Sequence, residues 1–315
     1  MPEYAPFGLG TAGVSERSFV AADEARGRTF PIDLWQPARA DTGTRCPLVV
    51  FSHCSGGSRR SAAYLCGHLA SHGYLIAAMD HSEVVASELA PGPDETATQR
   101  ASRVDAIIAS RVPDVRFLID HVLAAGLNVD ADRIGLAGHS FGGWTALAVP
   151  EQDARIGAVV AMGPGGGSNP LPGILPLELT FAWGRDIPVL YLAAADDVPV
   201  PLAAVRELFG RTPGSPRMFV LQRADHQHFF DDVEGEHEAL RAMTLPGDAA
   251  WIPAAMRPVS ELCSGAEAHE FVRGLTLAHF DATLRQSEAA ARFLAGDAAA
   301  ALAARGVDAA EYRGC

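Results

Sequence analysis

The sequence lacks the features that mark several classes of protein. No segment approaches the run of about 20 apolar residues that a membrane-spanning helix needs. The first residues, MPEYAPFGLG, contain neither the basic stretch nor the apolar run of a secretory signal peptide. We therefore expect a soluble cytoplasmic protein without stable membrane insertion, or a secreted one if a leader was removed.

Cysteines and basic residues are also few. None of the five cysteines stands in a C-x-x-C pair, which argues against a zinc knuckle, and their odd number does not indicate a disulfide framework. The formal net charge of −13 at pH 7 predicts repulsion from nucleic acid and from anionic membranes. We interpret the acids of an expected helix over 234–243 as a solvated face. The cysteines are Cys46, Cys54, Cys66, Cys263 and Cys315.

The rest of the composition is typical of a globular protein. The chain has 315 residues, of which 48% are hydrophobic and 20% are charged, so it can bury a sizeable core. We expect a single α/β domain over 1–315. Residues 244–265 contain three prolines and predict an irregular insertion, whereas the Ala-rich stretch 266–305 predicts helix.

Short apolar runs alternate with expected helices along most of the chain. Two runs at 17–22 and 28–36 flank a turn and predict an N-terminal antiparallel hairpin. The alternation after them indicates a mostly parallel sheet with helices on both faces. Pro113 should kink or split the helix expected over 100–124. The other expected strands are 47–51, 74–79, 133–137, 156–162, 188–193 and 217–222.

The strongest chemical signal is GHSFG at 138–142, a G-x-S-x-G motif that lies between an expected strand and an expected helix. The chemistry needs a sharp turn that projects the Ser140 hydroxyl above the sheet, and small residues on either side let the backbone cross there. Phe141 then begins a helix, where its free N–H can stabilise an oxyanion. Ser140 is thus the candidate nucleophile.

A nucleophilic serine needs a base and an acid, which on such a sheet follow in the order Ser, Asp or Glu, His. Asp196 and Asp197 follow the strand at 188–193, and either could serve, although both could instead cap the next helix. The stretch ADHQHFFDD at 224–232 follows the last strand and offers His226 and His228. A histidine base is the leading interpretation; a metal site and a purely structural role are the alternatives.

Four blocks of residues resemble the α/β-hydrolases, in the branch of dienelactone hydrolases and platelet-activating-factor acetylhydrolases. They are FSHCSGGSR at 51–59, LASHGY through AAMDH at 69–81, GHSFGG at 138–143, and PVL through DVPVP at 188–201. The resemblance covers roughly 45–230. It implies the α/β-hydrolase fold, and it assigns the acid to Asp197 and the base to His226, with His228 as a neighbour.

The resemblance also implies an oxyanion hole made of two backbone amides, those of Phe141 and Ser55. This chain departs from the family at Cys54, where glycine is expected, and cysteine would be strained there if the position requires positive φ. Cys54 is either a tolerated small residue or a thiol that borders the site and confers sensitivity to thiol reagents. Possible residues lining the site are His53, Cys54, His139 and His228.

These features predict a serine carboxylester hydrolase that acts through an acyl-enzyme on short- to medium-chain esters, with no metal or organic cofactor. The alternatives are a thioesterase, amidase or acyltransferase with the same triad, or a non-catalytic binding protein on this fold. The cysteine nucleophile of a dienelactone-type enzyme is not present at Ser140. The expected partner is a small-molecule ester; the sequence indicates neither the natural substrate nor the oligomeric state.

A long segment after His226 is a second departure from the family pattern. Residues 235–265 either cap the acyl or alcohol pocket, with Trp251 and Ile252 facing it, or form an inert surface excursion. We expect Trp144 and Phe229 to belong to the core rather than to the pocket.

Overall fold

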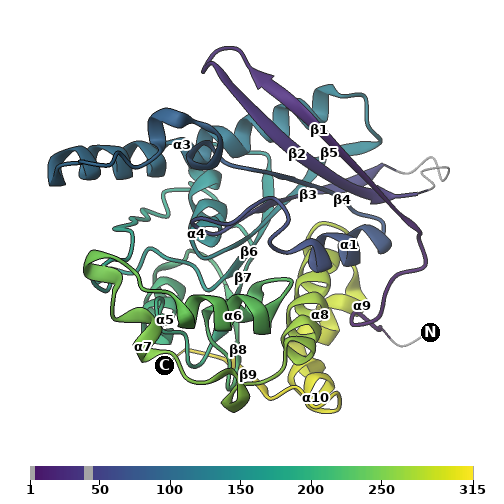
Figure 1. Ribbon diagram of the computed structural model, residues 1–315. Helices are drawn as coiled ribbons and strands as arrows, with labels where there is room; N and C mark the ends of the chain where they lie inside the picture. Colours follow the sequence, from purple (N-terminus) through teal and green to yellow (C-terminus); the bar gives the residue numbers. More distant parts are fainter. Residues whose placement is uncertain (1–3, 39–44, 315) are drawn as a thin grey trace.

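A computed structural model describes residues 4–38 and 45–314, and Figure 1 shows their arrangement. Strands β1 (Val14–Asp23) and β2 (Arg28–Pro37) pair antiparallel, with Asp23 opposite Arg28 at the turn. Gly27 takes φ +61° in this turn, a conformation that glycine adopts without cost. The N-terminal hairpin expected from the sequence is confirmed.

The strands of the described residues form one nine-stranded sheet in the order β1-β2-β4-β3-β5-β6-β7-β8-β9. Strands β4, β3, β5, β6, β7 and β8 run parallel, while β2 pairs antiparallel with β4. All six expected parallel strands are present, as predicted from their continuous apolar runs. Their bounds are β3 Cys46–Ser52, β4 Leu75–Met79, β5 Val129–His139, β6 Ile156–Met162, β7 Val189–Ala194 and β8 Arg217–Leu221.

Helices cover both faces of this sheet (Figure 1). One face packs on α3 (Ala97–Ala124), α4 (Phe141–Ala148) and α5 (Leu202–Arg211), and its buried side chains form one hydrophobic cluster. The other face packs on α1 (Ala63–Ser71) and α8 (Gly265–Thr283) in a second cluster. The α/β-hydrolase fold expected from the sequence is therefore confirmed.

Helix α3 continues through Pro113, where the sequence predicts either a kink or a split, and the split is wrong. The proline does not split the helix, which runs without interruption for 28 residues. The missing N–H costs one helical hydrogen bond, but Val112, Val115 and Leu118 around it are buried and pack both segments of the helix against the core. At the other end, Thr96 and Gln99 form a capping box, and the exposed first turns project beyond the sheet (Figure 1).

The C-terminal part contains one strand that the sequence pattern does not reveal. Strand β9 (Ala309–Tyr312) pairs antiparallel with β8 at the sheet edge. Its four residues are too few to show a clear alternation. None of the helices in the described part of the chain has the length and apolarity to cross a membrane. The remaining helices include α9 Glu288–Arg292, the π-helical η6 Phe293–Asp297 and α10 Ala298–Ala303, and also α2 Ser82–Val85, η1 Ser87–Leu89 and η2 Val149–Glu151.

The segment between His226 and α8 is built of short helices. η3 (His226–Phe229) is followed by α6 (Val233–Ala242), whose exposed acids agree with the expected solvated face. Residues 244–265, expected as an irregular loop, contain only one-turn helices joined by extended residues until α8 begins at Gly265. They are η4 Gly247–Ala249, α7 Ile252–Ala255 and η5 Val259–Glu261.

Candidate active site

Ser140 lies in the sharp turn between β5, which ends at His139, and α4, which begins at Phe141. Its backbone has φ +57° and ψ −116°, a combination that a non-glycine residue rarely adopts. The turn is held by a hydrogen bond of 2.8 Å from the Ser140 N–H to the Met162 carbonyl. Ser140 is only partly buried, so the strand-to-helix turn presents its side chain at the carboxyl edge of the sheet.

The glycines of the motif allow close approach of the backbone rather than positive φ. A Cβ on Gly138 would lie 2.2 Å from the carbonyl oxygen of Gly142. A Cβ on Gly142 would lie 1.9 Å from the carbonyl oxygen of Ser52, at the end of β3. Real Cβ atoms do not reach such distances, so the spacing G-x-S-x-G follows from the packing of β3, β5 and α4.

His226 and Asp197 lie against each other at the same edge. Nδ1 of His226 is 2.7 Å from Oδ2 of Asp197, and Oδ1 of Asp197 accepts a hydrogen bond of 2.8 Å from the Val200 N–H. Asp196 instead pairs with Arg257, at 3.2 Å. Nδ1 of His226 therefore donates to Asp197, which leaves Nε2 as the nitrogen that can accept a proton.

Burial and charge set the protonation of this pair in opposite ways. Burial tends to lower the pKa of His226, but the charge of Asp197 and the hydrogen bond to it outweigh burial and raise the pKa above its ordinary value. Burial raises the pKa of Asp197, while His226 and the Val200 N–H counteract this. The result is a histidine whose protonated form is stabilised by its neighbour, as a general base requires.

Gly163, at the end of β6, makes room for the pair. A Cβ at Gly163 would lie 3.3 Å from Oδ2 of Asp197 and 3.5 Å from Nδ1 of His226, and its φ is +47°. Both facts disfavour a side chain here. The sequence gives a weak hint, because a glycine ends the apolar run 156–162.

His228, the other histidine of the stretch, is fully buried. Its Nδ1 is 2.9 Å from Oδ1 of Asp225 and its Nε2 is 3.1 Å from the Cys263 carbonyl. Although burial opposes the charge, Asp225 and Cys263 raise the pKa of His228 to about 10. His237 also lies against Asp225, with Nδ1 2.6 Å from Oδ2. Asp225 thus contacts two histidines and caps η3.

The other two candidate histidines are also buried. The His139 ring lies 4.5 Å from the His226 ring between centroids, and burial followed by the proximity of His226 holds its pKa well below the ordinary range. It is a neutral packing partner of His226. His53 lies below the site, with Nδ1 2.7 Å from the Cys54 carbonyl and Nε2 accepting from the His81 N–H at 3.1 Å.

The two oxyanion amides expected from the resemblance come from different elements. Phe141 is the first residue of α4, where the N–H has no carbonyl of its own helix to bind. Ser55 is exposed in the loop after β3. Cys54 is not among the described non-glycine residues with positive φ, so cysteine in place of glycine is not strained there.

The Cys54 thiol should be inert. It is 6% exposed, and burial raises its pKa to about 12, so almost no thiolate forms at neutral pH. We expect that iodoacetamide leaves the rate of ester hydrolysis unchanged under native conditions, while the partly exposed Cys46 reacts first among the four cysteines that the structure describes. Peptide mass mapping beside the activity assay checks this. Loss of activity in step with alkylation of Cys54 would instead favour a thiol that borders the site.

Sequence reasoning missed one charged residue near the site. Arg111 is completely buried in α3 and contacts the backbone of the loop that carries Ser55. A signal was present, because Arg111 occupies the apolar stripe of α3 formed by Ile107, Val115 and Leu118. In the part of the chain that the structure describes, no group of three or more His, Cys, Asp or Glu residues is arranged to hold a metal ion.

Comparison with known proteins finds similarity to enzymes that act on esters. The family model "Platelet-activating factor acetylhydrolase, isoform II" matches residues 28–105, from β2 into α3, a stretch that includes Ser55 but not Ser140. The chain is 28% identical over 173 residues to a platelet-activating factor acetylhydrolase of Canis lupus familiaris. That match covers 42% of this chain and 38% of the dog protein, so the chain spans well under half of this relative.

Two further proteins widen the comparison. Cutinase est1 of Thermobifida alba is 26% identical over 180 residues, which cover 56% of this chain and 51% of the cutinase. The solved structure of a ferulic acid esterase from Streptomyces cinnamoneus superimposes with a TM-score of 0.61 and 24% identity, over 90% of this chain and 93% of the esterase. This last likeness concerns the fold. The chain therefore has the α/β-hydrolase fold, and part of its sequence is similar to platelet-activating factor acetylhydrolases and to a cutinase.

Proposed function

We propose that the chain is a serine carboxylester hydrolase with Ser140 as nucleophile, His226 as general base and Asp197 as the acid. One observation carries the proposal. Asp197 holds Nδ1 of His226 at the sheet edge where the strained turn presents Ser140. The printed names of the relatives, an acetylhydrolase, a cutinase and an esterase, support ester chemistry.

The proposed reaction has two halves. Nε2 of His226 takes the hydroxyl proton as Oγ of Ser140 attacks the ester carbonyl, and the imidazolium returns that proton to the leaving alcohol. Water then attacks the acyl-enzyme with the same base, which releases the acid and restores Ser140. Asp197 fixes the tautomer and stabilises the imidazolium. The amides of Phe141 and Ser55 would stabilise each oxyanion by about 3 kcal/mol per donor. None of these steps requires a metal or an organic cofactor.

The substrate proposed is a small-molecule ester of short to medium acyl length. Hydrolysis of p-nitrophenyl esters from acetate to palmitate measures this directly, and mass spectrometry after treatment with a fluorophosphonate identifies the reactive serine. We expect hydrolysis of the shorter esters, a burst of p-nitrophenol equal to the enzyme concentration where deacylation is slower than acylation, and a label on Ser140. A wild-type protein that hydrolyses none of these esters and takes no label would overturn the proposal.

The same acyl-enzyme could pass its acyl group to an acceptor other than water. Hydroxylamine and a thiol added during turnover separate these outcomes, because they yield a hydroxamate or a thioester in place of the free acid. Free acid as the dominant product supports a hydrolase. The cytoplasmic location expected from the sequence stays a prediction, which fractionation of producing cells would check.

We also propose that residues 235–265 cap the substrate pocket of a single α/β domain. Two contacts support this: Trp251 donates a hydrogen bond of 3.0 Å to the Pro172 carbonyl, and Arg257 pairs with Asp196 beside the acid. The segment therefore links the loop after β6 to the loop that carries Asp197. Ile252 is buried at 6% exposure, while Trp251 is partly buried.

Replacing residues 245–255 by a short Gly-Ser linker should change the preference for acyl length. Removing part of the apolar wall of the pocket should change the ratio of kcat/KM for the octanoate ester to kcat/KM for the acetate ester by about 10-fold or more. The measurement is the ester panel on both proteins at equal concentrations of titrated sites. An unchanged ratio in a folded variant would show that the segment is an inert surface excursion.

A further inference from the structure

Arg111 binds the backbone next to the proposed oxyanion hole from the inside of the protein. Its Nη1 donates a hydrogen bond of 2.7 Å to the His53 carbonyl, and its Nη2 donates one of 3.3 Å to the Cys54 carbonyl. The side chain is fully buried. A buried arginine is uncommon, and its guanidinium stays protonated, so these carbonyls are held by a permanent charge.

The Cys54 carbonyl belongs to the same peptide group as the Ser55 N–H. In a trans peptide these two groups point in opposite directions. Because Arg111 and Nδ1 of His53 both bind the Cys54 oxygen on the buried side, the Ser55 N–H points to the other side, where Ser55 is exposed. Rotation of this peptide would break these two hydrogen bonds and a third, of 3.2 Å from the Gly57 N–H, and would leave a buried carbonyl unsatisfied.

The Arg111 guanidinium also contacts Phe141, the other residue of the proposed oxyanion hole. Its Cζ lies 4.0 Å from the centroid of the Phe141 ring, within the range of a cation–π contact. The Phe141 backbone supplies the second proposed amide. We propose that Arg111 is a positioning residue that sets both oxyanion amides, one through the Cys54 carbonyl and one through the Phe141 ring.

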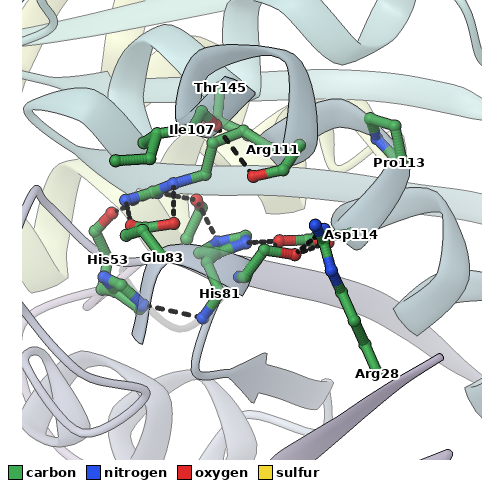
Figure 2. A network of polar contacts seen from close by, with 12 residues as sticks. Arg28, His53, His81, Glu83, Ile107, Arg111, Pro113, Asp114 and Thr145 are labelled. Atoms are coloured by element: carbon green, nitrogen blue, oxygen red, sulfur yellow. Dashed lines mark hydrogen bonds and ion pairs between the residues drawn. The ribbon is translucent and has the colours of Figure 1, made fainter. Parts of the chain in front are cut away.

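A rigid network holds Arg111 in place (Figure 2). Glu83 binds it through Nε at 3.2 Å and through Nη2, and Ser52 Oγ accepts from Nη1 at 3.3 Å. Ser52 is in turn 2.8 Å from Nε2 of His81, whose Nδ1 lies 3.3 Å from Asp114. Ser52, His81 and Asp114 thus repeat a Ser-His-Asp order, but all three are buried. These three residues therefore have no access to substrate, and their role is to orient Arg111.

The inference rests on the proposed function, and two variants test it. Arg111→Lys keeps the positive charge beside Glu83, but a single ammonium cannot reproduce the planar fork that spans both carbonyls. Arg111→Met combined with Glu83→Gln removes the fork without leaving a buried carboxylate unpaired. Arg185→Met is the matched control, because Arg185 also donates to backbone carbonyls, those of Pro150, Asp153 and Ile156, at the amino end of β6.

The oxyanion forms only in the transition state, so both Arg111 variants should lower kcat and change KM little. We expect a loss of kcat per titrated site of about 10- to 100-fold for p-nitrophenyl butyrate, less than for outright removal of a donor. A trifluoromethyl ketone, which forms a tetrahedral oxyanion on the nucleophilic serine, should lose affinity by the same factor. Arg185→Met should lose thermal stability but keep its kcat per titrated site.

The inference is overturned if folded Arg111 variants keep the wild-type kcat per titrated site. It is also overturned if ketone affinity is unchanged while kcat falls, or if Arg185→Met loses kcat equally for the same drop in Tm. A wild type without hydrolysis and without fluorophosphonate labelling is a different result, because it removes the proposed function itself and the oxyanion hole with it.

Discussion

Replacement of Ser140 by alanine should lower kcat for p-nitrophenyl esters by about 10⁵- to 10⁶-fold. The variant has no atom that can attack the ester carbonyl. Without this attack, neither the base His226 nor the oxyanion amides can contribute to the reaction. Rates measured at equal protein concentration, beside wild type, give the ratio. The fold should persist, because Ser140 is partly buried and its hydroxyl caps no helix.

The network around Arg111 makes the choice of control important. Ser52 also has a histidine nitrogen at 2.8 Å, but it is buried, so we expect a reagent from solvent to reach Ser140 and not Ser52. Fluorophosphonate should label Ser52→Ala at Ser140 and should fail to label Ser140→Ala. Labelling of Ser140→Ala at Ser52, or residual hydrolysis within about 100-fold of wild type, would contradict the assignment of the nucleophile.

Replacement of Asp197 by asparagine should lower kcat by about 10⁴-fold. Asparagine has nearly the same shape, but its amide can donate to Nδ1 of His226, which favours the tautomer in which Nε2 carries the proton and cannot accept another. The matched control is Asp196→Asn. Asp196 precedes Asp197 in the chain but pairs with Arg257 instead of His226, so this change should cost far less.

The same variant should change the pH dependence of kcat/KM. His226 must be neutral to act as a base, so activity rises as pH rises through its pKa. In wild type that pKa lies above the ordinary value: burial lowers it, but the charge of Asp197 and its hydrogen bond outweigh burial. Without the charge the pKa falls, and the acid limb should move to lower pH while the plateau drops. An acid limb that stays in place would show that Asp197 does not set the pKa of His226.

Much of the fold could be predicted from the sequence because its signals are local. Continuous apolar runs such as 156–162 and 189–194 mark buried parallel strands, whose alternation with helices restricts the topology. Where the prediction failed, tertiary contacts overrode local preference. Pro113 does not split α3 because the core holds the helix on both sides, and β9 forms only because the edge of β8 is available.

The proposed site was predictable in part for the same reason. Ser140 stands in a motif whose glycines are required by backbone packing, and strand ends bring the acid and base loops to one edge. The choice between Asp196 and Asp197, and between His226 and His228, required the family resemblance. Spacing alone could not make it, since neighbouring residues in a loop point in different directions.

Local sequence patterns were sufficient to predict the fold class, the strained serine turn and the order of the acid and base loops, because each depends on residues close in the chain. The tertiary structure was needed to find that Arg111 binds the loop of Ser55, and that Asp197, the acid implied by the resemblance, contacts His226. These contacts join residues far apart in sequence, such as Arg111 and Cys54. Their geometry depends on how β3, α3 and the β7 and β8 loops pack, which no local pattern specifies.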